Sequence, residues 1–209
     1  MRRAVLVALC APLISCSSWL KSNAPPLQSY LLHAAPAAPA ATGEAPAPAL
    51  SGASLRVLYP TAAPGFDTDR ILLLEPDRRL DYYAASRWAA ALPDVVEQLA
   101  AESLRRSGHW GNVEDSRGAF PTAYLLQLRI RRFEADYAGE AGAPMVRVAF
   151  DCWVGRSDAR ALLASFSVER TEPAAENRVR AVVAAFERAA DEALGEVAER
   201  TAAAVKPSG

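Results

Sequence analysis

The sequence predicts an α+β fold, in which an antiparallel sheet carries two helices on one face as a two-layer sandwich. Apolar and polar residues alternate along three successive stretches between residues 123 and 168, as is typical of strands with one buried face. The turns between these stretches are too short for helical crossovers, so neighbouring strands are expected to run antiparallel. Two other segments, ending near residues 108 and 205, space their apolar residues at the helical period.

The first fifteen residues have the composition of an export signal. Arg2 and Arg3 precede an apolar run over residues 4–14. This run is shorter than the roughly 20 residues that a membrane-spanning helix needs. Residues 1–15 are therefore expected to be a signal peptide, with a small buried helix as the alternative.

Cys16 lies directly after this segment. Ser15 precedes it and Leu13 lies two positions before the serine, a pattern that resembles a bacterial lipobox, whose cysteine is diacylated and becomes the first mature residue. A plain signal peptide with an incidental cysteine is the alternative. Each buried methylene contributes about 0.8 kcal/mol, so two or three acyl chains such as palmitate form a firm anchor. By resemblance to lipoprotein sorting rules, Ser17 predicts the outer membrane.

Composition limits the possible function classes. The 194 of 209 residues that remain after the signal peptide are enough for one domain and a tail. Loss of Arg2 and Arg3 lowers the basic count from 23 to 21 against 24 acidic residues, which argues against nucleic-acid binding. Since Cys10 lies in the signal and Cys16 is the lipid site, Cys152 has no disulfide partner within the mature chain. In its apolar strand, Cys152 is expected to be an inert core residue rather than a reactive thiol.

Residues 16–53 are expected to be a lipidated tether containing an Ala/Pro-rich linker. Residues 28–32 form a brief apolar run that could be a first strand. From residue 34 to 51, repeated prolines favour extended, solvated chain over helix or paired strand. The folded domain is expected to span residues 54–205.

Its first half contains three short strands and a helix. Residues 55–59 and 70–75 are predicted strands, and residues 80–83 are expected to pair back on the second strand as a hairpin. Ser86 is a plausible helix cap, Pro93 suits a first helical turn, and Gly108 is expected to end the helix in the left-handed conformation. Residues 112–115 form a possible further short strand.

Its second half contains the three long strands and a second helix. The strands are predicted over residues 123–137, 146–154 and 162–168. Pro173 is expected to open a long amphipathic helix that reaches about Val205. The polar face of this helix is acidic rather than basic, so packing on the sheet is favoured over a membrane surface.

The sequence contains no convincing catalytic or metal-binding pattern. His33 and His109 lie in contexts that suggest no triad, and no closely spaced pair of zinc ligands exists. Asp67 and Asp69 begin like a calcium loop, but the remainder of that motif is missing, so they are expected to be solvated turn residues. No enzymatic activity, metal or cofactor is predicted.

Four aromatic residues stand where a simple core does not need them. Tyr82, Tyr83 and Trp88 cluster near the predicted junction of hairpin and helix, and Trp153 lies opposite the apolar face of its strand. They either fill a core from both sides or form a patch that contacts a partner or lipid, since aromatic residues are enriched at interfaces.

The order of these features resembles the ABC-type transport auxiliary lipoprotein family, the PqiC-like group. The resemblance covers nearly the whole mature chain, apart from the Ala/Pro-rich insertion. The resemblance depends on the lipobox and on an ordered series of segments, namely residues 30–32, residues 66–71, the hairpin ending at residues 80–83, residues 85–88 and the helix ending at Gly108.

The resemblance implies a non-enzymatic accessory protein on the periplasmic face of the outer membrane. It implies as partners an MCE-domain periplasmic protein and an inner-membrane ABC permease, which together move phospholipid or other hydrophobic molecules between membranes. A homo-oligomer is also conceivable. The alternatives are an assembly lipoprotein that chaperones or plugs a β-barrel and, least favoured, a periplasmic hydrolase, for which the chain lacks a pair of nucleophile and base.

Overall fold

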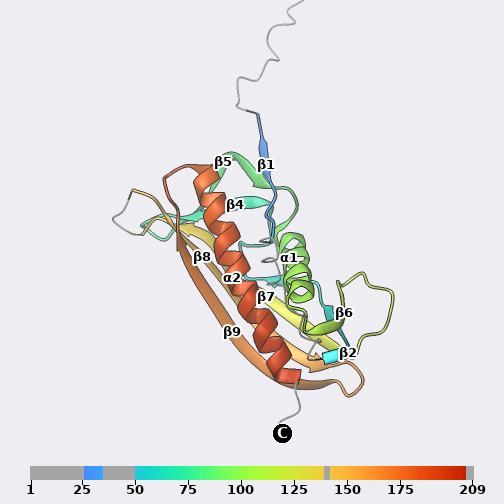
Figure 1. The fold of residues 1–209 in the computed structure, drawn as a ribbon. Helices are drawn as coiled ribbons and strands as arrows, with labels where there is room; N and C mark the ends of the chain where they lie inside the picture. Colours follow the sequence, from blue (N-terminus) through green and yellow to red (C-terminus); the bar gives the residue numbers. More distant parts are fainter. Residues whose placement is uncertain (1–25, 35–49, 139–141, 206–209) are drawn as a thin grey trace, which may run out of the picture.

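The computed structural model describes residues 26–34, 50–138 and 142–205. Within these ranges the chain forms nine strands in one mixed sheet and two helices, which confirms the α+β class (Figure 1). Cys16 and most of the Ala/Pro-rich stretch lie outside the described residues, so the lipid anchor and the linker stay predictions.

The central strand of the sheet is β7. The strands are β1 (Gln28–Tyr30), β2 (Leu50–Val57), β3 (Thr61–Ala62), β4 (Arg70–Leu74), β5 (Leu80–Trp88), β6 (Trp110–Glu114), β7 (Tyr124–Asp136), β8 (Met145–Arg156) and β9 (Ala161–Pro173). The helices are α1 (Leu92–Arg106) and α2 (Val179–Val205). The strand order is β1-β5-β4-β7-β2-β6, with β3 also paired to β7 and with β8 and then β9 following on from β7.

The three long strands form the predicted antiparallel meander. β7 pairs with β8 and β8 with β9 over nearly their whole lengths, with Leu128 opposite Cys152 and Cys152 opposite Phe166. The pairing shifts register between Ile130 and Arg132 on β7. The shift changes which side chains face the core further along the strand, so that Phe133 and Ala135 are buried there.

Several shorter strands pair in parallel, so the prediction of an antiparallel sheet was wrong for this part of the fold. β2, β3 and β4 lie one after another along β7 and run in its direction, and β1 runs parallel to β5. Parallel pairing needs a long crossover connection. The chain supplies one through α1, which lies between these short strands and β7 in the sequence. The β4–β5 hairpin is antiparallel, as predicted.

The segment around Ser86 is a strand and not the start of a helix. β5 continues to Trp88 because it pairs with β1, Tyr30 being opposite Trp88, and because the Trp88 N–H donates to the Asp69 carbonyl at 2.7 Å. Helix α1 starts after the extended Ala91 and has a proline in its first turn. It ends before Gly108, whose φ of 68° is left-handed, as predicted.

Both helices pack on the same face of the sheet (Figure 1). Helix α2 lies along β8 and β9 and buries a stripe that includes Val182, Phe186 and Leu194, as expected for a helix that packs on the sheet. It begins at Val179, because Pro173 ends β9 and does not open the helix. The sheet also includes Gln28–Tyr30 and the start of β2, residues that precede the predicted domain boundary at 54.

Candidate interaction surface

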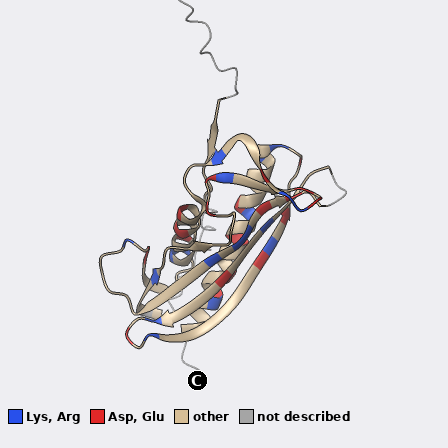
Figure 2. Cartoon of the chain, turned by 180° about the vertical axis from the view of Figure 1, so that it is seen from behind, with Lys and Arg blue, Asp and Glu red and all other residues tan. Residues whose placement is uncertain are grey.

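The helices leave the other face of the long strands open. Figure 2 shows this face from behind, with the positions of Lys and Arg and of Asp and Glu distributed along the strands. Alternation on β8 explains the division: Val148 and Phe150 are buried in the core, whereas Arg147, Asp151 and Trp153 point away from it. A partner therefore has access to this open face.

The middle of the open face is polar and internally paired. Arg131 lies 3.6 Å from Asp151 and 3.1 Å from Glu169, so one guanidinium group joins all three long strands. The Ser167 hydroxyl donates to Asp151 at 2.7 Å. These contacts divide the open face into two ends, and the aromatic candidates from the sequence are distributed between the ends and the core.

Trp88 belongs to the core. It is 1 % exposed, and its ring contacts Phe133 and Phe186 edge-on, with centroids 5.9 and 5.3 Å away. Phe133 and Phe186 stack on each other at 4.9 Å. Of the two roles considered for this residue, the structure therefore supports core packing, and Trp88 has no surface to offer a partner.

Tyr83 and Tyr82 alternate on β5. Tyr83 is half-buried, and its hydroxyl lies 2.9 Å from that of Tyr137, which donates to Asn177 at 2.7 Å. Burial is the main reason why the pKa of Tyr83 is raised. Tyr82 is 46 % exposed, with the Arg70 guanidinium 4.4 Å from the centre of its ring. Tyr82 is therefore the residue of this pair that is available for contact.

A buried carboxylate lies level with Tyr82 in the sheet. Glu134 is 2 % exposed, accepts the Phe133 N–H at 2.8 Å and pairs with Arg132 at 3.4 Å. Burial raises the pKa of Glu134 to about 7, with nearby Asp136 adding to the effect, although Arg132, the Phe133 N–H and Arg147 oppose it. The charge of the Glu134 carboxyl therefore changes near neutral pH.

Trp153 lies at the other end of the open face. It is opposite Gln127 on β7. Gln127 lies seven residues from Glu134, which is level with Tyr82, so the two ends are roughly 23 Å apart at about 3.3 Å per residue. Trp153 lines a groove of about 290 Å³ together with Leu58, Leu125 and Leu162. The groove is mainly apolar, with Gln127 and the arginines of the β8–β9 turn among its polar members.

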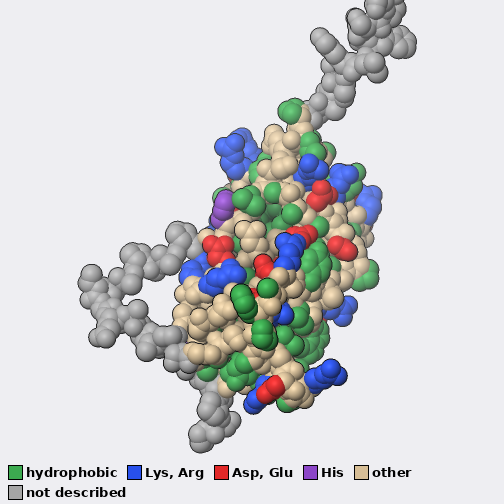
Figure 3. All heavy atoms as spheres, turned by 90° about the vertical axis from the view of Figure 1, so that its right-hand side faces the viewer, with side chains coloured by type: hydrophobic (Ala, Val, Ile, Leu, Met, Phe, Trp, Pro, Cys, Tyr) green, Lys and Arg blue, Asp and Glu red, His purple; other side chains and the backbone are tan. Residues whose placement is uncertain are grey.

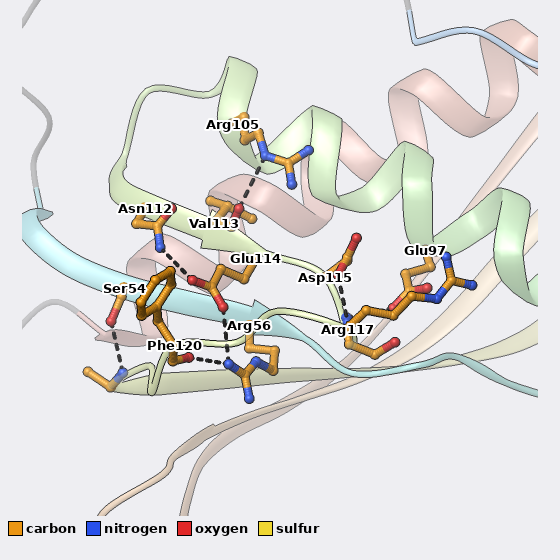
Figure 4. A network of polar contacts seen from close by, with 12 residues as sticks. Ser54, Arg56, Glu97, Arg105, Asn112, Val113, Glu114, Asp115, Arg117 and Phe120 are labelled. Atoms are coloured by element: carbon orange, nitrogen blue, oxygen red, sulfur yellow. Dashed lines mark hydrogen bonds and ion pairs between the residues drawn. The ribbon is translucent and has the colours of Figure 1, made fainter.

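A polar network holds the loop beside this end of the sheet (Figure 4). Arg56 pairs with Glu114 at 3.1 Å and also donates to the carbonyl of Phe120. The Ser116 N–H donates to Glu97 at 2.8 Å, and the Ala123 N–H to the Ser54 hydroxyl at 3.0 Å. The Phe120 ring stays 71 % exposed. Figure 3 shows other hydrophobic side chains on this side of the molecule, between scattered charges.

The cysteine and the possible metal-ligating side chains of the described residues do not gather at one place. Cys152 is 1 % exposed and burial raises the pKa of its thiol to about 12, which agrees with the expected inert core role. Within the described ranges, no three His, Cys, Asp or Glu side chains lie close enough to hold a metal ion. Neither of the two helices described here is long and apolar enough to cross a membrane.

Sequence reasoning identified Trp153 but not the residues around it. Leu125 alternates with the buried residues of β7, so an apolar side chain on the more solvated face could have been recognised from the sequence. Leu162 was not detectable, because a register shift between Val154 and Gly155 puts it opposite Gly155, and it is 63 % exposed. Leu58 enters the groove only because β2 pairs with β7.

Comparisons with known proteins agree with this architecture. A search of curated proteins found no match. Among solved structures, protein XCC0632 from Xanthomonas campestris, described under the family model DUF330, is similar with a TM-score of 0.70 and 25% identity, over 86% of this chain and 94% of that one. An uncharacterised protein shares the fold with a TM-score of 0.59 and 13% identity, over 72% and 93% of the two chains. The model of the family described as the ABC-type transport auxiliary lipoprotein component matches residues 30–198, and the chain therefore belongs to this family.

Proposed function

We propose that this auxiliary lipoprotein is held on the periplasmic face of the outer membrane by acyl chains on Cys16. We further propose that it serves an MCE-type ABC transport system, in which an MCE-domain periplasmic protein and an inner-membrane permease move phospholipid or another hydrophobic molecule between membranes. The observation that carries the proposal is the family match over residues 30–198, which runs from β1 into α2. In this role the protein binds and positions its partners and performs no chemistry.

The arrangement of the molecule supports a tethered docking role. β1 lies at one end of the fold and the β8–β9 turn at the opposite end (Figure 1). Cys16 precedes the first described residue by ten positions, so at about 3.5 Å per residue the acyl anchor would lie within roughly 35 Å of the β1 end. The groove around Trp153 would then face away from the outer membrane, towards the periplasm.

Contact with a partner is proposed for the exposed aromatic residues. Trp153 would contribute through the groove, and Tyr82 would contribute at the other end of the open face, with Tyr83 supporting it from the half-buried side of the strand. Trp88 is left out of this proposal because it lies in the core. The expected partner surface is apolar at its centre, as interface cores commonly are.

The test uses the anchored protein in cells. A photo-crosslinking amino acid replaces Trp153 in one variant and the exposed Arg180 on α2 in a matched control. Each is combined with native Cys16 or with Cys16→Ala, followed by membrane fractionation and identification of crosslinked partners. We expect the native anchor to keep the protein in the outer-membrane fraction and position 153 to capture an MCE-domain protein more strongly than position 180.

Two results contradict the proposal. Capture of a β-barrel protein at position 153, in stoichiometric amount, supports instead an assembly lipoprotein that chaperones or plugs a barrel. Unchanged fractionation of Cys16→Ala shows that Cys16 does not anchor the chain.

A further inference from the structure

β9 forms an edge of the sheet, because among the described strands it pairs only with β8. The Ala174 N–H donates to the Pro144 carbonyl at 3.0 Å, so these two residues form a hydrogen-bonded pair at the end of the β8–β9 ladder. In antiparallel strands, every second residue forms such a pair and the residues between them point their backbone groups the other way. Even-numbered residues from 164 to 174 therefore direct their backbone groups towards β8. Ser165, Ser167, Glu169, Thr171 and Pro173 direct theirs to the free edge, where another strand can pair. This alternation ends before Ala164, where the register shifts opposite Gly155.

Arginine side chains occupy one part of this free edge. The carbonyl of Ser167 accepts from Arg200 at 3.1 Å, that of Glu169 from Arg170 at 2.8 Å, and that of Pro173 from Arg188 at 3.2 Å. Acidic side chains of α2 and β9 hold these arginines in place, through the ion pairs Arg200–Glu196, Arg170–Glu196 and Arg188–Glu172. A strand approaching residues 167–173 would have to displace guanidinium groups that are already paired.

No side chain of the described residues bonds the backbone of the remaining five edge residues, 161–165, which include the register shift opposite Gly155. In the part of the chain that the structure describes, no side chain bonds the outward backbone groups of Ser165, in contrast to Ser167 two residues later. This segment also presents Leu162, 63 % exposed, and Leu163, 40 % exposed. It borders the Trp153 groove, so a strand added here would cover apolar surface as well as make backbone hydrogen bonds.

We propose that an extended apolar segment of a partner protein, with an acidic residue beside it, adds to residues 161–165 as a further strand. Strand addition takes its affinity from main-chain hydrogen bonds and its selectivity from side-chain pockets, both of which this edge supplies. The acidic residue follows from Arg160, which is exposed at the start of the segment and has no ion-pair partner among the described residues. This inference goes beyond the proposed transport role and does not depend on it.

Charge favours a different protein over a second copy of this chain. Symmetric antiparallel pairing of residues 161–165 would centre on Leu163 and put Arg160 of one copy opposite Phe166 of the other. Residues 160–166 contain no acidic side chain. A second copy would therefore leave Arg160 without an opposite charge at both ends of the ladder, which makes it a poorer partner than a segment with an acidic residue.

The test measures binding of a fluorescent synthetic peptide, Asp-Val-Thr-Val-Thr-Val-Asp, to the full chain purified in detergent. Ser165→Pro removes an N–H that faces the free edge and leaves the ladder with β8 intact, as prolines on edge strands do. Ser165→Ala is the matched control, because it loses the same hydroxyl but keeps the N–H. We expect Ser165→Pro to weaken binding by about tenfold and Ser165→Ala to bind like the native chain. Equal binding by the two variants overturns the proposal.

Hydrogen exchange on the native chain provides a test that needs no variant. The peptide is expected to protect amides in residues 161–165 and to leave those in residues 167–173 unchanged; uniform protection or none overturns the proposal. A peptide with lysine at both ends should bind more weakly to the native chain and better to Arg160→Glu. If sedimentation shows a dimer of the native chain that Ser165→Pro abolishes, the occupant is a second copy and the choice of partner is wrong.

Discussion

At the scale of single residues, burial determines what an aromatic or acidic side chain does in this protein. Trp88 and Trp153 are the same residue type in one sheet, yet the first is 1 % and the second 37 % exposed. Glu134 is an acidic side chain almost without solvent contact, at 2 % exposed. These differences lead to separate predictions for stability and for its dependence on pH.

Trp88→Ala is expected to lower the free energy of unfolding by about 3–5 kcal/mol, because it removes a ring packed against Phe133 and Phe186. Trp153→Ala is the matched control and is expected to cost less than about 1 kcal/mol, since its ring is partly solvated already. Urea unfolding followed by circular dichroism measures both. Similar losses in the two variants would show that Trp88 has no special role in the core.

Glu134→Gln is expected to change how stability depends on pH. The pKa of Glu134 is about 7 in the folded protein and near 4.5 when unfolded, so the folded state binds the proton more tightly. The stabilisation from this group is therefore complete below about pH 4.5 and lost as the pH rises through 7. As the pH rises from 4.5 through 7, the free energy of unfolding of the native chain should fall by on the order of 3 kcal/mol relative to that of Glu134→Gln. Unfolding curves at several pH values that run parallel for the two proteins would contradict this.

At the scale of elements, short strands and loops depend on side-chain contacts for their positions. β6 and the loop after it are joined to β2 and α1 by the Arg56–Glu114 pair and by the bond from the Ser116 N–H to Glu97. These contacts hold the segment that presents Phe120 beside the sheet. The loop is therefore expected to respond to the loss of one partly buried ion pair.

Arg56→Ala is expected to cost about 1–3 kcal/mol and to speed amide exchange in residues 115–123, because Glu114, 12 % exposed, loses its charged partner. Arg117→Ala is the matched control, because Arg117 pairs with Asp94 but its side chain is 74 % exposed. Its free energy of unfolding is expected to change by no more than about 0.5 kcal/mol. Unchanged exchange in Arg56→Ala would mean that backbone contacts alone hold the loop.

At the scale of the whole molecule, one core includes residues far apart in the sequence. Leu32 precedes the Ala/Pro-rich stretch, yet it is 3 % exposed and belongs to the same core as both helices. β1, next to it, adds a parallel strand to β5. The segment before the linker is therefore part of the folded unit.

Leu32→Ala is expected to destabilise the protein by about 2–4 kcal/mol, as deletion of a buried leucine side chain does. Leu31→Ala, at the adjacent and 48 % exposed position, is the control and should remain within about 1 kcal/mol of the native chain. Thermal unfolding of both variants measures the difference. Equal midpoints would indicate that residues 26–34 do not contribute to the core.

Local patterns were enough to predict much of the fold. Alternation along residues 124–154 identified β7 and β8 because side chains on one strand face opposite sides, whichever strand is its neighbour. The helical period and Gly108 located α1 and its end in the same way. The sequence put Trp88 at the start of a helix, whereas it lies at the end of β5. That strand is stabilised by β1, whose Tyr30 is 58 positions away in the sequence.

The sequence by itself determined the α+β class, the meander, the long C-terminal helix and Trp153 as a contact candidate, because each depends on spacing within one segment. Only the tertiary structure decided the parallel pairings, the core position of Trp88 and the presence of Leu58 and Leu162 in the groove. It also decided which part of the β9 edge carries arginines, since two of those three side chains come from α2. These features arise from contacts between distant segments, and no local period encodes them.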